Sequence, residues 1–261
     1  MKWTAALFVI AMVFIPRVVA HARFTGPKVA DAKPGDLRVI ATAAIRDPFD
    51  AVRKQAESLI GKPIIAEYGS ARGNLKEMIL KGQDFELAML LPDVDDDILA
   101  AGKIMPDRFE IARVPIALGL RGEAPAPDVS TLAAVKAAML NARSVRYAPT
   151  GAALMTVKKI LSMLEIADKV RDSSTARAEV PLGAGEYEIN IYPLSEIIPN
   201  KRLRNLGAVI APLQAPAIVE ATVGRNATDP KATRALITFL QGPAIDQPLK
   251  DFGMEKGRVG R

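Results

Sequence analysis

The chain has 261 residues, a formal net charge of +6, one histidine and no cysteine. A chain of this length folds as one large or two small domains, with cores that need no disulfide bonds. Because the only histidine is His21, near the N-terminus, the remaining chain lacks the imidazole and thiol groups needed for Ser-His or Cys-His hydrolysis, structural zinc, histidine-ligated haem and thiol redox chemistry. Any catalysis must use Asp, Glu, Lys, Arg or Tyr, and we expect no metal and no cofactor.

The N-terminus has the pattern of a cleaved export signal. A basic start is followed by an apolar run over residues 3–15, which is too short to span a bilayer. Ala20 and Ala22 are small residues at the first and third places of the triplet 20–22, so we predict a signal peptide over residues 1–22 and a periplasmic mature protein. The alternative, an uncleaved membrane anchor, needs a longer apolar stretch, and Arg17 interrupts this one.

The charge that remains after this segment is mildly positive and mixed. Removing residues 1–22 takes away Lys2 and Arg17, which lowers the net charge of +6 by two. The other basic residues are scattered among acidic ones and only four tyrosines are present, so the pattern argues against a nucleic-acid partner. It favours a small anionic ligand, and we expect the mature protein to be a monomer.

From residue 36 onward, short β-branched runs alternate with amphipathic segments. The first predicted strands and helices are, in order, residues 36–43, 48–60, 62–68, 74–80 and 85–91. Asp47 and Pro48 are typical of a helix start, with Asp47 as the cap. Strands joined by helices predict a parallel sheet covered on both faces, with loops 42–46 and 69–74 side by side at the carboxyl ends of the strands. Each loop leads into a helix N-terminus, where an anion is favoured.

The rest of the chain continues this alternation without a flexible linker or an internal repeat. The predicted elements are strands 109–120, 144–148, 186–192, 206–213 and 217–223, and helices 130–140, 152–164 and 230–240. Thr150 and Asp229 are the expected caps of the last two helices. Four aspartates within residues 93–97 lack the spacing of an EF-hand and are interpreted as a solvated helix start.

Five short segments occur in an order and spacing that resemble the molybdate-binding branch of type II periplasmic binding proteins, a branch that aconitate isomerase also resembles. They are VIATAAIRD at 39–47, YGSARGNL at 68–75, KGQDFELA at 81–88, GAGEYEINIY at 183–192 and FLQGPA at 239–244. The resemblance implies an α/β, two-lobed fold in which each lobe is a mostly parallel sheet flanked by helices, with the ligand in the interlobe cleft. Lobe I is expected to comprise residues 36–113 plus 216–258, and lobe II residues 114–215.

The resemblance also locates the family's ligand-binding positions in this sequence. Two serines whose hydroxyls donate to a tetrahedral oxyanion match Ala44 and a position on or beside Arg72, and a tyrosine that faces the ligand matches Tyr192. Hydroxyl donors are therefore lost, while arginines appear in both loops. With the N-terminus of the central helix, which matches residues 149–151, the predicted ligand-binding residues are Ala44, Arg46, Ser70, Arg72, Thr150, Gly151 and Tyr192.

The arginines bear on the kind of anion. A guanidinium commonly holds a carboxylate through two parallel hydrogen bonds, whereas a desolvated oxyanion can be bound by neutral dipoles alone. We therefore expect an organic di- or tricarboxylate in preference to molybdate, sulfate or phosphate. Each residue also has a structural interpretation, because Arg46 can pair with Asp50 on a helix surface, Ser70 and Thr150 can cap helices, and Tyr192 can pack into the core.

Three functions are consistent with these patterns. The first is an exported solute-binding protein that delivers a small carboxylate to a membrane ABC permease. The second is an isomerase on the same scaffold, resembling aconitate isomerase, in which Glu196 or Tyr192 moves a proton across an allylic system of a tricarboxylate. The third is a transport protein for molybdate or another oxyanion. The first two are not separated by sequence, because a ligand-contacting carboxylate and a catalytic base are the same residue type.

Overall fold

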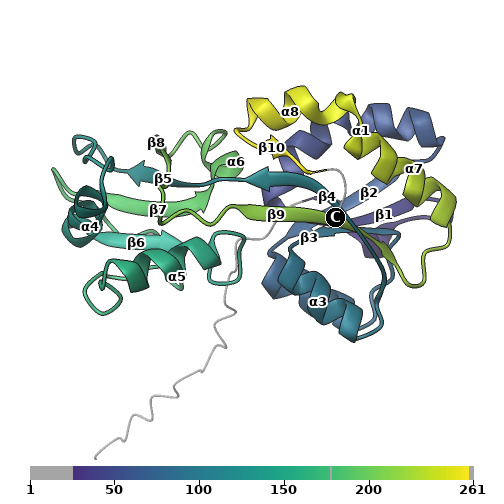
Figure 1. Cartoon of the computed structure of the whole chain (residues 1–261), viewed down its shortest axis with the longest axis horizontal. Helices are drawn as coiled ribbons and strands as arrows, with labels where there is room; N and C mark the ends of the chain where they lie inside the picture. Colours follow the sequence, from purple (N-terminus) through teal and green to yellow (C-terminus); the bar gives the residue numbers. More distant parts are fainter. Residues whose placement is uncertain (1–25, 177, 259–261) are drawn as a thin grey trace, which may run out of the picture.

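The computed structural model describes residues 26–258 except residue 177. The predicted signal peptide and its cleavage after Ala22 lie outside the described residues. Within them, the chain forms a six-stranded and a four-stranded sheet, which lie side by side along the long axis of the molecule (Figure 1). The chain passes from the first sheet to the second at Pro115 and returns between residues 208 and 217.

The six-stranded sheet has the order β10-β4-β9-β3-β1-β2. Its strands are β1 (Leu37–Thr42), β2 (Ile64–Gly69), β3 (Leu87–Leu90), β4 (Ile104–Val114), β9 (Ala217–Gly224) and β10 (Glu255–Lys256). On one face lie α1 (Arg46–Ile60), α7 (Pro230–Gln241) and α8 (Asp246–Asp251), and on the other lies α3 (Pro92–Ala100), with α2 (Lys76–Leu80) packed beside it (Figure 1). Short helical turns complete this lobe at η1 (Val29–Asp31), η2 (Ala43–Ile45), η3 (Ala71–Leu75) and η4 (Pro243–Ile245).

The four-stranded sheet has the order β6-β7-β5-β8. Its strands are β5 (Ile116–Arg121), β6 (Ser144–Tyr147), β7 (Glu188–Pro193) and β8 (Arg204–Ala208), and its helices are α4 (Leu132–Asn141), α5 (Leu154–Met163) and α6 (Leu194–Ile197). We call the half with the six-stranded sheet the first lobe and the other half the second lobe. The exact boundaries predicted for the lobes stay a prediction.

The predicted α/β fold class is confirmed, with one correction: the sheets are mixed, not mostly parallel. β1 pairs in parallel with β2 and β3, and β6 with β7. In contrast, β9 runs antiparallel to both β3 and β4, and β5 antiparallel to β7 and β8. The reason is topological, because β9 returns from the second lobe and enters the first sheet between β3 and β4 from the opposite end. Parallel pairing is kept where a helix connects the paired strands.

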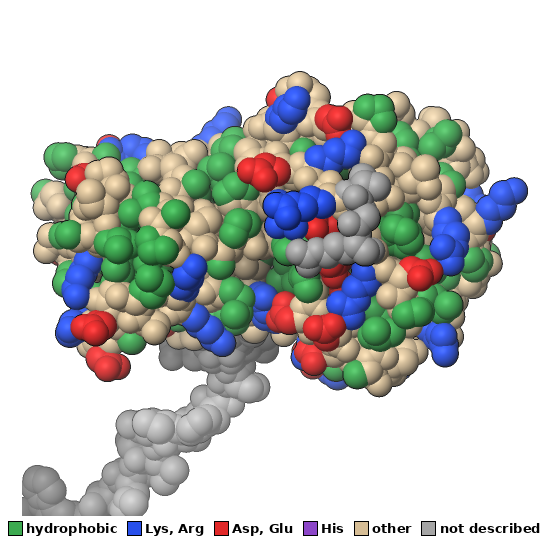
Figure 2. All heavy atoms as spheres, in the orientation of Figure 1, with side chains coloured by type: hydrophobic (Ala, Val, Ile, Leu, Met, Phe, Trp, Pro, Cys, Tyr) green, Lys and Arg blue, Asp and Glu red, His purple; other side chains and the backbone are tan. Residues whose placement is uncertain are grey.

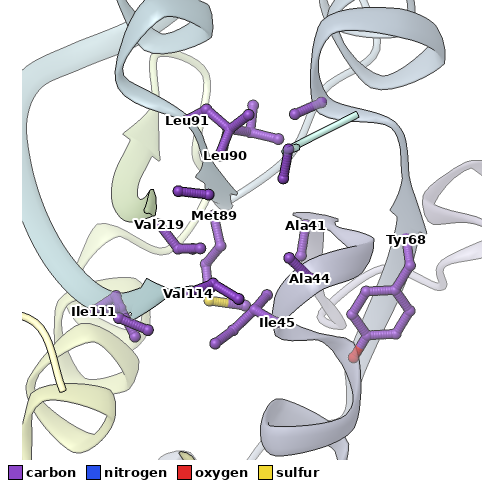
Figure 3. Packing of buried hydrophobic residues seen from close by; sticks show 14 of the residues in the cluster. Ala41, Ala44, Ile45, Tyr68, Met89, Leu90, Leu91, Ile111, Val114 and Val219 are labelled. Atoms are coloured by element: carbon purple, nitrogen blue, oxygen red, sulfur yellow. The ribbon is translucent and has the colours of Figure 1, made fainter. Parts of the chain in front are cut away.

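The core of the first lobe anchors the loop that follows β1. Ile45 lies beside Val114 of β4, and Met89 of β3 extends toward both (Figure 3). Ala44 is also buried, next to Ala41 at the end of β1 (Figure 3). A close-packed turn of this kind cannot shift without opening a cavity. The next residue, at the start of α1, therefore leaves the core at a defined place.

One predicted helix cap is confirmed and another is wrong. The Asp229 carboxylate accepts the N–H of Ala232 at 2.9 Å and caps α7. Helix α1 begins at Arg46 with Ile45 before it, and no side chain caps it. Asp47 is already helical, because η2 runs directly into α1 and starts the helix earlier than predicted. Its charge still lies in the first turn, where it favours the helix dipole.

The acidic segment lies at the start of α3, as interpreted, and three of its aspartates have more than half of their side-chain surface exposed, whereas Asp95 departs from the interpretation. Asp95 is buried, with 0 % of its surface exposed. The other three aspartates pair with basic side chains of β4, η3 and α2, and these pairs are Asp93–Arg72, Asp96–Arg108 and Asp97–Lys76. The interpretation is wrong for Asp95 alone, because α3 packs against β4 and β9, and a local acidic pattern does not report which side of the helix these strands cover.

Basic and acidic side chains are interspersed over the face shown in Figure 2, without a continuous basic surface on that face. No helix within residues 26–258, residue 177 left aside, combines the length and hydropathy needed to cross a bilayer.

Candidate functional site

The residues predicted to bind a ligand lie between the lobes, near the carboxyl ends of β1, β2, β6 and β7. They come together in two groups. The first group joins the loop after β2 to the loop after β6 and consists of Ser70, Arg72, Thr150 and Gly151. The second joins the start of α1 to the end of β7 and the start of α6, and consists of Ala44, Arg46, Tyr192 and Glu196.

The first group is a direct contact between the lobes, which we call the loop contact. The Ser70 Oγ lies 2.7 Å from both the carbonyl oxygen and the Oγ1 of Thr150, and the Arg72 N–H donates to the same carbonyl at 3.1 Å. Gly73 permits this approach, because a Cβ there would lie 2.7 Å from the Thr150 Oγ1. The hydroxyls bond across the lobes and cap neither helix, so the predicted capping by Thr150 is wrong; α5 begins only at Leu154.

Arg72 uses all three guanidinium nitrogens in contacts with the protein. Its Nε and Nη2 donate to the two carboxylate oxygens of Asp93 at 2.6 and 2.9 Å, and its Nη1 donates to the Gly151 carbonyl at 2.7 Å. Its side chain is 15 % exposed. Arg72 thus ties α3 of the first lobe to a loop of the second. Its predicted contact with a ligand stays a prediction beside this structural contact.

Ala44 contributes its backbone to the second group. Its carbonyl accepts the Ser195 hydroxyl at 2.8 Å, and both residues are buried. This bond fixes α6 against η2 across the lobe interface. Ser195 was not predicted from the sequence, because its partner is a backbone group 151 positions away and no local pattern marks it.

The side chains of Arg46, Tyr192 and Glu196, which we call the Arg46 cluster, have polar atoms without a hydrogen-bond partner among the described residues. Arg46 donates through Nε to Asp47 at 3.2 Å. Its two Nη nitrogens, the Tyr192 hydroxyl and the Glu196 carboxylate form no hydrogen bond with any described residue. All three side chains are partly exposed. The expected pair of Arg46 with Asp50 is not formed, because Asp50 pairs with the next arginine of α1.

The environment of the Arg46 cluster changes how its acids titrate. Burial raises the pKa of Glu196 to about 7, and the charge of Arg46 opposes the rise while that of Asp47 adds to it. Burial also raises the pKa of Tyr192 to about 12, and the charge of Glu196 acts in the same direction. A half-buried carboxyl group that titrates near neutral pH is typical of functional sites.

The Arg46 cluster therefore offers a cation with two uncommitted nitrogens, a phenolic donor and a carboxyl group. Such a set can hold a carboxylate by hydrogen bonds and can exchange a proton with it. Within the part of the chain that the structure describes, no three His, Cys, Asp or Glu side chains are placed to hold a metal ion.

The chain has two α/β lobes joined by crossing strands, and polar groups without a partner among the described residues lie where the strand ends of the lobes meet. This arrangement is that of two-lobed ligand-binding proteins. Residues 37–255 match the bacterial extracellular solute-binding proteins, and the chain belongs to this family. The resemblance to periplasmic binding proteins that the sequence motifs indicated is thereby confirmed.

The chain is similar to proteins of more than one function. Aconitate isomerase from a Pseudomonas species is 20 % identical over 238 residues, which are 88 % of this chain and 91 % of the relative. The molybdate-binding protein of Azotobacter vinelandii is 24 % identical over 229 residues, 85 % of this chain and 90 % of the relative. The solved structure of a periplasmic molybdate-binding protein from Azotobacter vinelandii has a TM-score of 0.63 at 15 % identity, and the match covers 87 % of this chain and 100 % of that one. These likenesses support the fold and leave the ligand open.

Proposed function

We propose that this protein is an exported solute-binding protein of the periplasm. It captures a small organic di- or tricarboxylate between its lobes and delivers it to an ABC permease in the membrane. The observation that carries the proposal is the Arg46 guanidinium, whose two Nη nitrogens have no partner among the described residues. A guanidinium with both terminal nitrogens available matches the two oxygens of a carboxylate.

The surroundings of Arg46 support a carboxylate over molybdate. The Ser70 and Thr150 hydroxyls bond to each other, and Ala44 has no hydroxyl, so the donors that suit a tetrahedral oxyanion are absent or engaged. The Tyr192 hydroxyl remains as a neutral donor near Glu196, the carboxyl group on which Arg46 acts. Capture of molybdate or another oxyanion is the alternative that the experiment below must exclude.

A thermal-shift screen of the mature protein tests this proposal. Molybdate, sulfate, phosphate and a panel of di- and tricarboxylates are compared at pH 6. At about a hundred times the dissociation constant, a ligand adds about 2.7 kcal/mol to the free energy of unfolding, which for this chain length raises the Tm by about 5 to 10 °C. We expect such a shift with a carboxylate. A shift with molybdate alone would contradict the carboxylate assignment.

A second candidate function is favoured by Glu196. A partly exposed carboxyl group with a pKa of about 7, beside the Tyr192 hydroxyl and Arg46, has the properties of a general base. In this candidate, the Glu196 carboxylate removes a proton from the allylic carbon of a tricarboxylate, and the proton returns to the other end of the allylic system. No electron is transferred to or from the protein, so no cofactor is needed.

Proton NMR in deuterated water distinguishes the two functions. The protein is incubated with cis- and trans-aconitate, and an isomerase would interconvert them while deuterium enters the allylic position. Glu196→Gln should then abolish turnover, whereas Glu123→Gln, at an exposed carboxyl group of the same lobe, should not. Binding without turnover or exchange supports the transport function.

The loop contact gives a further prediction, which concerns how long a ligand stays bound. Arg72→Ala removes the bond to the Gly151 carbonyl that crosses the lobes, so we expect a bound carboxylate to dissociate about tenfold faster, as for the loss of one charge-assisted hydrogen bond. Dissociation rates are measured by stopped flow. Asp93→Asn distinguishes the two functions of Arg72, because it removes the carboxylate that holds the guanidinium. Faster dissociation is expected if Arg72 joins the lobes. Tighter binding is expected if the freed guanidinium contacts the ligand instead.

A further inference from the structure

We propose that Glu196 takes up one proton as the anion binds, so that the protein captures its carboxylate together with a proton. This inference rests on the proposed function. The inference concerns the net charge of the Arg46 cluster together with Asp47. Asp47 is included because its carboxylate accepts the Arg46 Nε–H at 3.2 Å.

The charge balance of the cluster is the first argument. Arg46 carries one positive charge, but Asp47 is bonded to it and compensates that charge. Tyr192 is neutral at physiological pH, because its pKa is raised and not lowered. With Glu196 ionised, the Arg46 cluster together with Asp47 therefore has a net negative charge. An incoming carboxylate would be repelled unless Glu196 is protonated.

The other charged groups near α6 do not change this balance. The helix packs against η2, β5, β7 and β8, and Gly253, after α8, also lies against Leu194. On that side, Lys256 of β10 pairs with Asp246 of α8 at 2.7 Å. On β5 and β7, Arg121 and Glu188 are paired with each other at 3.1 Å, and Arg146 of β6 lies 3.4 Å from the same Glu188 carboxylate. On β8, Arg204 donates to backbone carbonyls, among them that of Gly122 at 2.9 Å. Arg146 and Glu188 act on Tyr192 in opposite directions, so they largely offset each other there. The charges that act on the Glu196 carboxyl group are those of Arg46 and Asp47.

The geometry also favours a protonated carboxyl group in the bound state. The Ser195–Ala44 bond holds the start of α6 against η2 and so keeps Glu196 near Arg46 while the lobes are in contact. The Glu196 carboxylate has no donor among the described residues that would keep it ionised. Protonation turns it into a hydrogen-bond donor, which is the function that a ligand carboxylate requires. Loss of solvent on binding acts in the same direction, because burial disfavours the charged form.

Isothermal titration calorimetry of the mature protein tests the inference. The probe is trans-aconitate, whose carboxyl groups are all ionised at the pH used, titrated at pH 7.5 in buffers of different ionisation enthalpy. The dependence of the heat on the buffer gives the number of protons taken up, and we expect ~0.75 per ligand for a group with a free pKa near 7. Above this pH, the affinity should fall about tenfold per pH unit.

Glu196→Gln should bring the proton uptake close to zero and make the affinity independent of pH, while Glu123→Gln should behave as the unmodified protein does. Binding of trans-aconitate without proton uptake, or equal uptake by Glu196→Gln, overturns the inference and leaves the proposed function standing. No binding of trans-aconitate at pH 6, with no thermal shift from any carboxylate, overturns the proposed function and the inference together.

Discussion

Replacing Arg46 with alanine is expected to weaken carboxylate binding about a hundredfold, which corresponds to about 2.7 kcal/mol. The substitution removes the two Nη nitrogens that have no partner within residues 26–258, residue 177 left aside, and leaves the Asp47 charge uncompensated beside the site. Both effects act against an anion. The fold should be retained, because the side chain is 39 % exposed and, among the described residues, bonds to its neighbour in the chain alone.

The measurement is the dissociation constant of the carboxylate identified by thermal shift, compared with that of Arg53→Ala. Arg53 lies on the same helix and pairs with Asp50 at 3.3 Å, so its loss changes the net charge equally without touching the Arg46 cluster. We expect Arg53→Ala to bind within about twofold of the unmodified protein. Equal losses of affinity in the two variants would show a general effect of charge and would remove Arg46 from the site.

Replacing Asp95 with asparagine is expected to raise the free energy of unfolding at pH 9 by several kcal/mol. Burial raises the pKa of Asp95 to about 8, the charges of Glu220, Asp96 and Asp93 add to this rise, and Arg108 opposes it. Neither carboxylate oxygen of Asp95 has a hydrogen-bond partner within the described residues. At high pH the native state must therefore hold a buried charge, which the asparagine side chain does not carry.

The sign of the pH dependence follows from the raised pKa. The folded protein keeps the Asp95 proton up to about pH 8, whereas the unfolded chain loses it near pH 4, so unfolding releases a proton in between. The free energy of unfolding should fall by about 1.4 kcal/mol per pH unit from pH 4 to 8, and this component should vanish in Asp95→Asn. Urea unfolding at several pH values measures it, with Asp97→Asn on the same helix as the control. Parallel pH profiles of the unmodified protein and Asp95→Asn would contradict the prediction.

Much of the fold could be predicted, because apolar periodicity reports local structure directly. The strand at residues 36–43 and the helix to Ile60 appear within a few residues of their predicted positions as β1 and α1. Strand direction could not be predicted in the same way. The apolar pattern of residues 217–223 is that of a buried strand, and it does not state from which end the strand enters a sheet.

Part of the candidate site could be predicted, because the loops at the strand ends and the family resemblance both indicate which residues lie near the ligand. Arg46, Tyr192 and Glu196 were singled out from their positions, and the structure brings them together. Asp93 was missed as the partner of Arg72, since the two lie 21 positions apart and the acidic segment resembles an ordinary helix start.

The sequence by itself determined the alternation of strands and helices, the lack of the His and Cys chemistry after residue 21, and the loops in which the arginines lie. These features depend on residue type and on neighbours along the chain. Only the tertiary structure decided which polar groups are hydrogen-bonded within the described part of the protein and which remain available to a ligand. Arg46 and Arg72 have the same side chain in equivalent loops, yet Arg72 is held by Asp93 and Gly151, while two nitrogens of Arg46 have no partner in the described part of the chain. Hydrogen bonding and burial depend on groups that are distant in sequence and adjacent in space, and a local pattern does not contain them.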